Sequence, residues 1–240
     1  MKKIYCLLCI IIVLFPLYGS AQIKHTNTNF IWLNYNQSIQ LHHKWTLLND
    51  IQFRTKNWFQ NQSLIAVRSG IAYAINKHAN AAAGFAWFAN FRNINDAAIV
   101  SNEYRFWQDV SFQSPWDNKV ISNRIRLEER FLQQIINGAQ SNKYDKKLRL
   151  RYKVEIGIPI LKSNVTCNIG NEVMVNIDYI HSNQFFDQNR AYFFLNIPMV
   201  KNTLFQFQYI KIFQWQVNNN ILDNQNVFRF SVHQKLNIKK

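Results

Sequence analysis

Two kinds of residue pattern in this sequence could do chemistry. The first is a Ser-x-His pair near the C-terminus, Ser231 and His233. In a β-strand, residues two apart project to the same face, so the hydroxyl and the imidazole would lie side by side. A hydroxyl next to a general base is the arrangement used for nucleophilic catalysis, and it could serve the hydrolysis of an ester. Because Ser-x-His also arises by chance, a simple pair of polar strand residues is the favoured alternative.

The second pattern places charged residues at every second position of long segments. Between residues 120 and 132, the even positions carry Arg124, Arg126, Glu128 and Arg130, whereas most of the odd positions are apolar. Residues 147–160 repeat the pattern with Arg149 and Arg151. A period of two predicts β-strands with one polar and one apolar face.

Both the Ser-x-His pair and the alternating charged residues are therefore expected on β-strands. The period of two recurs along the chain, and no segment has a sustained helical spacing of apolar residues. The predicted strands are 30–41, 45–56, 63–75, 81–92, 102–113, 120–132, 147–160, 165–177, 190–197, 203–215 and 226–238. Most approach the length of about 9 to 11 residues that a tilted strand needs to cross a bilayer, whereas soluble strands average about 5 or 6. We therefore predict an all-β fold, a closed antiparallel transmembrane β-barrel.

The connections between these segments alternate in length. Those at 42–44, 76–79, 114–119, 161–164 and 198–202 are short, and those at 93–101, 134–145, 178–189 and 216–225 are long and rich in Asn. Outer-membrane barrels have short periplasmic turns and long external loops. Because single-chain bacterial barrels have an even number of strands, we expect about twelve strands, with 23–29 as the additional one, or ten as the alternative.

The N-terminus has the features of a signal peptide. Lys2 and Lys3 precede an apolar stretch from Ile4 to Tyr18, and small residues lead to a cleavage site after Ala21. We predict a signal peptide at 1–21, export through the Sec pathway, and a mature barrel at 22–240 in the outer membrane of a Gram-negative bacterium. The alternative, a membrane-anchoring helix, would need about 20 apolar residues.

Composition excludes several other classes of protein. Hydrophobic residues make up 48% of the chain, charged residues 17% and aromatic residues 15%, which rules out intrinsic disorder. The formal net charge of +15 invites a nucleic-acid-binding hypothesis. Export and the segregation of charge to one strand face argue against it, so we expect no nucleic-acid partner. Metal binding needs three or four convergent ligands, and the spacing of the histidines suggests no metal and no cofactor.

In a membrane barrel the charged faces must point inward, because an Arg facing lipid at the midplane costs about 2 to 4 kcal/mol. We therefore predict an Arg-rich lumen with an ion-pair network of Arg54, Glu103, Arg105, Arg124, Arg126, Glu128, Arg130, Arg149, Arg151, Glu172 and Arg190. The excess of bases over acids also suggests a small anionic solute as a partner. A secreted, soluble barrel would have the opposite arrangement, with its apolar face inward and the arginines in water.

The ordered polar motifs resemble those of a known family. The sequence is similar, in its ordered motifs, to the exported bacterial family called domain of unknown function 2490. The similarity begins with an opening that contains Trp32, Tyr35, Trp45 and Arg54. The motifs that follow are Arg126-Leu127-Glu128-Glu129-Arg130-Phe131, Leu148-Arg149-Leu150-Arg151-Tyr152, Asn171-Glu172-Val173 and Phe186-Asp187-Gln188-Asn189-Arg190-Ala191-Tyr192. The resemblance implies an outer-membrane barrel without an established activity. It also implies that Arg126, Glu128, Arg130, Arg149, Arg151, Glu172 and Arg190 are the family's recurring polar residues.

Two functional hypotheses follow. The favoured one is a non-enzymatic, monomeric barrel in contact with outer-membrane lipid, either a narrow channel or a structural barrel whose interior is held by the predicted network. The alternative is an outer-membrane lipid hydrolase that uses Ser231 and His233.

Overall fold

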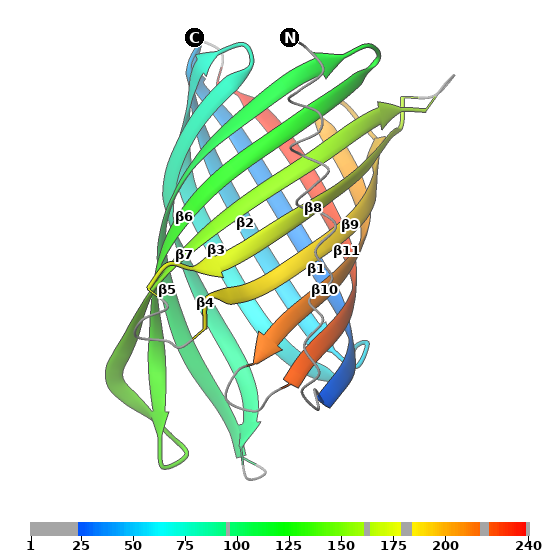
Figure 1. Cartoon of the computed structure of the whole chain (residues 1–240). Coiled ribbons are helices and arrows are strands. Elements are labelled where there is room, and N and C mark those ends of the chain that lie inside the picture. The colour runs from blue at the N-terminus through cyan, green and yellow to red at the C-terminus, as the bar shows by residue number, and fades with distance from the viewer. Residues whose placement is uncertain (1–23, 95–96, 161–163, 179–183, 217–220, 239–240) are drawn as a thin grey trace.

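The chain folds into a closed β-barrel in a computed structural model (Figure 1). The structure describes residues 24–94, 97–160, 164–178, 184–216 and 221–238. The predicted signal peptide, residues 1–21, lies outside the described residues. The described ranges contain no helix that is long and apolar enough to span a bilayer.

In the described residues, eleven strands follow one another around the barrel, and each overlaps one of the segments predicted from the alternation. They are β1 (Lys24–His42), β2 (Trp45–Lys56), β3 (Asn61–Asn76), β4 (Ala79–Ile94), β5 (Ala97–Trp116), β6 (Lys119–Ile136), β7 (Ala139–Pro159), β8 (Thr166–Asn176), β9 (Phe186–Pro198), β10 (Thr203–Gln216) and β11 (Ile221–Asn237). The predicted all-β closed barrel is thus confirmed.

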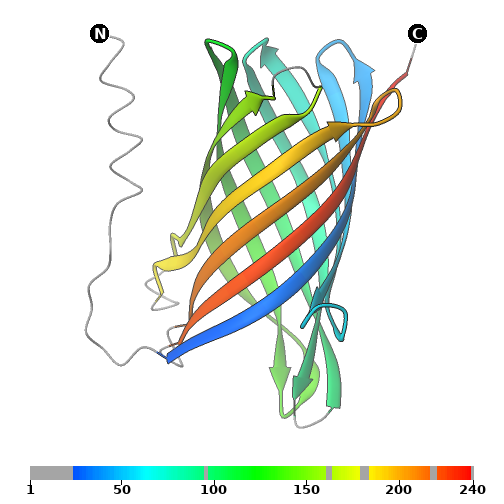
Figure 2. The ribbon, with the colours of Figure 1, turned by 90° about the vertical axis from the view of Figure 1, so that its right-hand side faces the viewer.

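The barrel closes through a parallel pair, which departs from the all-antiparallel expectation. Every sequential pair is antiparallel, but β1 and β11 run side by side in the same direction, from the pair Lys24 and Ile221 to the pair Gln40 and Asn237 (Figure 2). Residues 24–29, assigned to a twelfth strand from the sequence, instead lengthen β1. In a meander with an odd number of strands, the first and last run the same way, so their ladder must be parallel.

This parallel seam can be tested by cross-linking. In a Cys167→Ser background, Leu33→Cys with Phe230→Cys places two thiols at register partners of β1 and β11. We expect copper phenanthroline to cross-link this pair efficiently, measured as a shift of the unfolded protein on a non-reducing gel.

The matched control pairs Leu33→Cys with Leu236→Cys, six residues farther along β11. A parallel register separates those two positions by roughly 20 Å at about 3.3 Å per residue, so little cross-linking is expected. Efficient cross-linking of the control, or none of the Phe230 pair, would refute the seam.

Two connections predicted as long loops are instead extensions of hairpins. β4 and β5 pair as far as Ile94 and Ala97, and β6 and β7 pair as far as Ile136 and Ala139. Both hairpins project beyond the lower end of the barrel (Figure 1). Small and polar residues such as Ala97, Ala98, Gln140 and Ser141 interrupt the apolar alternation in these extensions, but their backbone groups still pair.

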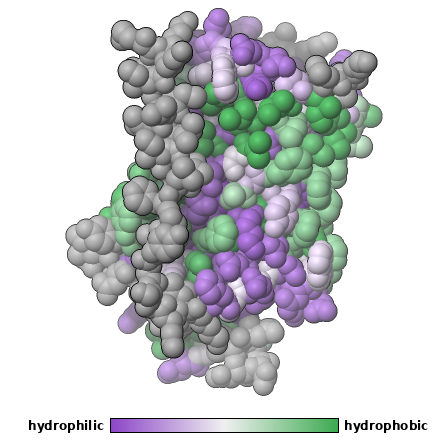
Figure 3. Space-filling view, turned by 45° about the vertical axis from the view of Figure 1, so that its right-hand side comes forward, coloured by the Kyte–Doolittle hydropathy of each residue, from purple (hydrophilic) through white to green (hydrophobic). Residues whose placement is uncertain are grey.

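The exterior of the barrel is apolar over much of its surface. Ile51, Phe106, Ile125 and Ile169 are each about half exposed, at 49% to 53% of the side chain's reference area. On the face turned toward the viewer in Figure 3, hydrophobic side chains form a band below a polar upper rim, and polar side chains dominate the lower half. On this face, the apolar band thus lies nearer the end that carries the short turns.

Two apolar clusters lie within the barrel wall. One contains Trp32, Tyr192, Phe194, Ile210, Ile212 and Val227, and the other contains Leu64, Ala66, Ala86, Phe88 and Trp107. In the second cluster the Trp107 indole lies against Gly70 and Gly84, which are register partners on β3 and β4. The two glycines therefore make the space that the indole fills.

Candidate functional site

A network of buried charged side chains occupies the middle of the barrel. The alternation of each strand brings its charged residues to one face, and the register sets these faces side by side. Glu128 on β6 pairs in register with Arg149 on β7, and Lys153 on β7 pairs with Glu172 on β8. The network therefore joins charged residues on neighbouring strands that lie about 20 positions apart in the sequence.

Glu128 is the centre of the network. One carboxylate oxygen accepts hydrogen bonds from Nε and a terminal nitrogen of Arg149, and the other accepts a 2.7 Å bond from Arg151. Arg105 adds a longer contact at 3.8 Å. The side chains of Glu128, Arg149 and Arg151 are 3%, 5% and 9% exposed, so this carboxylate compensates two guanidinium groups that have almost no contact with water.

Two further acids extend the centre toward β8 and β9. Glu172 accepts bonds of 2.8 Å from both Arg151 and Arg124. Asp187 accepts a 2.8 Å bond from Arg149. Asp187, predicted to lie in the long loop 178–189, lies in β9 and is buried. The central chain of ion pairs therefore joins four strands.

A second group of ion pairs lies on the β5 side. Glu103 accepts bonds of 2.6 Å from both Arg105 and Arg130, and Asp109 pairs with Arg126 at 2.5 Å. The guanidinium of Arg126 also lies over the Trp107 ring, 4.4 Å from its centroid. These arginines are thus held by carboxylates and by aromatic faces.

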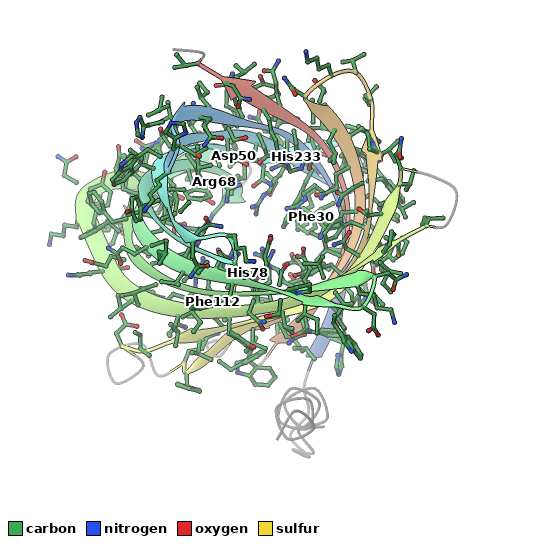
Figure 4. The ribbon with its side chains drawn as sticks, turned by 90° about the horizontal axis from the view of Figure 1, so that it is seen from above. Phe30, Asp50, Arg68, His78, Phe112 and His233 are labelled. Atoms are coloured by element: carbon green, nitrogen blue, oxygen red, sulfur yellow. The ribbon has the colours of Figure 1, made fainter. Side chains whose placement is uncertain are left out.

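Exposure of the ion pairs rises toward the short-turn end of the barrel. The Arg68 and Asp50 side chains, paired at 2.6 Å, are 24% and 15% exposed, well above the central residues. Viewed from that end, Asp50, Arg68 and His233 point into the ring of strands (Figure 4). The interior is therefore wetter near this end than at its middle.

Two residues of the predicted network have a different environment from the rest. Arg54 and Arg190 form no ion pair among the described residues, and the same holds for Arg229, which the prediction did not include. Instead, each donates to a glutamine carbonyl oxygen: Arg54 to Gln52, Arg190 to Gln188 and Arg229 to Gln206. The other predicted residues, Glu103, Arg105, Arg124, Arg126, Glu128, Arg130, Arg149, Arg151 and Glu172, all take part in ion pairs.

The glutamines were missed because an uncharged inward residue gives no signal in charge alternation. Their spacing does give one, because Gln52 lies two residues before Arg54 and Gln188 two before Arg190. Such a pair shares one face of its strand. Gln206 has no such signal, since it meets Arg229 only through the register of β10 and β11.

The Ser231 and His233 side chains do not form a catalytic pair in this structure. Ser231 is 1% exposed, and neither its Oγ nor Nε2 of His233 has a hydrogen-bond partner. A nucleophile needs its base within hydrogen-bond reach, so this geometry gives the lipid hydrolase hypothesis no support. Within the described ranges, no cluster of three or more His, Cys, Asp or Glu side chains is arranged to hold a metal ion.

The closed barrel and its buried network of Arg and acidic side chains define the class of protein: an all-β barrel with a charged core. No curated protein matches the sequence. Residues 29–223 match the family described as Protein of unknown function (DUF2490). This match covers most of the chain, so the chain belongs to the DUF2490 family, as the ordered polar motifs predicted.

Proposed function

We propose that this protein is a barrel of the bacterial outer membrane, with an Arg-rich lumen that the central ion pairs close to free ion flow. In this proposal it is a structural or solute-holding barrel and not an open pore. The observation that carries the proposal is the burial of three charged residues inside the barrel. Glu128, Arg149 and Arg151 are only 3%, 4% and 8% exposed, whereas side chains that line an open, water-filled pore would be exposed.

The exposed outer side chains support the membrane location. Ile51, Phe106, Ile125 and Ile169 present large apolar surfaces that no part of the described chain covers. Large contiguous apolar surfaces mark membrane or protein contacts. The hydrocarbon of a bilayer would cover these apolar side chains around the barrel. The guanidinium groups would stay inside the barrel with their carboxylates, because a charged side chain that faces lipid is destabilising.

The proposal predicts the electrical behaviour of the purified protein. Folded protein, identified by heat-modifiable gel mobility in detergent, is inserted into a planar bilayer for single-channel recording. We expect no steady conductance step, because the buried side chains leave little room for hydrated ions at the level of Glu128.

A variant with Glu128, Arg149 and Arg151 all replaced by Ser removes these side chains and their charges together. We expect this variant to conduct, provided that it retains heat-modifiable mobility. Regular conductance steps in the unmodified protein would contradict the closed lumen. Mobility that does not change on heating would instead count against a stable membrane barrel.

A further inference from the structure

Three interior arginines that have no carboxylate partner in the described part of the chain gather on one wall of the barrel. Arg54 on β2 and Arg229 on β11 are both register partners of Trp32 on β1, so these three residues form one row across the parallel seam. Arg190 approaches the same indole from β9. The chain thus brings together cations from positions 54, 190 and 229.

Distances to Trp32 show how close two of these guanidinium groups are. The Cζ atom of Arg54 lies 3.8 Å from the ring centroid of Trp32, and that of Arg190 lies 5.6 Å from it. The two Cζ atoms are therefore no more than 9.4 Å apart.

This wall differs chemically from the central network, where a carboxylate faces every arginine. A glutamine carbonyl orients a guanidinium group but contributes no negative charge, so the positive charges of Arg54, Arg190 and Arg229 stay uncompensated by any contacting acid. All three side chains are only partly buried, so they can still meet a solute. Arg54 uses Nε and one terminal nitrogen for Gln52, whereas Arg190 donates to Gln188 through Nε alone and Arg229 to Gln206 through one terminal nitrogen. The N–H groups that remain can donate to a carboxylate or a phosphate.

Buried polar atoms without partners add donors to the same wall. Nε of Arg229, Nε1 of Trp32 and Oγ of Ser231 have no hydrogen-bond partner, although Trp32 is 2% and Ser231 1% exposed. Buried donors are normally satisfied, and an orphaned one calls for an explanation. A bound anion near the row of Trp32 and Arg229 would provide an acceptor and offset the concentrated positive charge.

We infer that Arg54, Arg190 and Arg229 form a binding site for a small oxyanion, a phosphate or carboxylate group, on the inner wall beside Trp32. The inference rests on the proposed function, because it assumes that this wall faces the lumen of a membrane barrel. It names the class of solute that the lumen holds, with the guanidinium groups as ligands and the glutamines Gln52, Gln188 and Gln206 as positioning residues.

Binding is tested with the full-length barrel in a zwitterionic detergent, by calorimetric titration of inorganic phosphate at constant ionic strength set with sodium chloride. A second titration uses succinate in place of phosphate, to separate a phosphoryl site from a carboxylate site. We expect saturable binding of at least one of the two anions. Arg229→Gln and Arg190→Gln should each weaken this binding at least tenfold.

The matched control is Arg92→Gln, which removes the same charge from an exposed arginine of β4 that forms no ion pair among the described residues. Its binding should stay within twofold of the unmodified protein. Arg54→Lys keeps the charge but loses the planar fork, and we expect it to bind more weakly as well.

Absence of saturable binding of both anions would overturn the site, as would equal weakening by Arg92→Gln and Arg229→Gln. Heat-modifiable mobility of each variant establishes that it is folded before titration. Bilayer recording of the same preparation separates the two proposals: a barrel that inserts without conducting and binds neither anion refutes the site alone, whereas a conducting barrel refutes the closed lumen.

Discussion

Replacing Glu128 with Ala is expected to destabilise the barrel by about 3 to 5 kcal/mol, because it leaves buried charges without their partner. Arg149 and Arg151 each donate to this carboxylate, and Arg105 lies within 3.8 Å of it. Asp187 and Glu172 still compensate part of this charge, but they cannot reach the space that Glu128 leaves. The measurement is urea unfolding of the folded protein in lipid vesicles, followed by tryptophan fluorescence.

The neighbouring residue provides a control with the same chemistry in a different environment. Glu129 pairs with Lys146 at 3.5 Å, but their side chains are 36% and 64% exposed. An exposed ion pair contributes about 0 to 1 kcal/mol, so Glu129→Ala should have little effect. Equal free energies of unfolding for the two variants would show that the Glu128 carboxylate is not a structural centre.

Substituting Gly84 with Ala is expected to cost about 3 kcal/mol through steric overlap in a packed wall. A Cβ atom at this position would lie 2.3 Å from the carbonyl oxygen of Ser69, 2.5 Å from Trp107 Cζ2 and 2.7 Å from the Cα atom of Gly70. Two of these three atoms belong to the backbone of β3, which a rotamer change cannot move. The same urea titration measures the loss.

Gly157→Ala is the matched control. Its Cβ would meet the side-chain amide nitrogen of Asn168 at 2.8 Å, and the nearest backbone atom is 3.8 Å away. Because the Asn168 side chain can rotate, we expect a change below about 1 kcal/mol. If Gly157→Ala proved as destabilising as Gly84→Ala, the close contact between β3, β4 and Trp107 would not be the cause.

The strands could be predicted from the sequence because the two faces of each one differ so sharply in polarity. Beyond Gln133 of β6 the register with β7 shifts and two consecutive isoleucines follow, so the period of two is lost and the predicted strand ends too early. One local signal was available there: Asn137 and Gly138 both have positive φ, at 51° and 74°, as an Asn-Gly type I′ turn requires. This dipeptide predicts a tight hairpin in place of a long loop.

The partners inside the barrel were harder to predict. The alternation showed which residues share a face, but partner choice depends on the register between strands. Arg149 pairs with Glu128 and with Asp187, which are 21 and 38 positions away. The spacing places a glutamine beside Arg54 and another beside Arg190, but nothing local shows that the register brings no acid into contact with either guanidinium group. The eleven alternating segments already indicated an odd strand number, but the even number usual in bacterial barrels favoured a twelfth strand. The parallel ladder between β1 and β11, which lets eleven strands close, has no signal in either strand alone.

The ladder between β1 and β11 has a consequence for how the chain matures. It joins residues separated by almost the whole sequence, as in the bond from Thr26 to Asp223 across 197 positions. Contacts of such long range form slowly, because an extended loop must first lose its freedom. Until β11 is available to pair, the facing edges of β1 and β10 lack their partner strand, and such unpaired edges readily pair with other chains. The C-terminal strand β11 therefore closes the barrel, and chaperones would have to cover the open edges until β11 pairs.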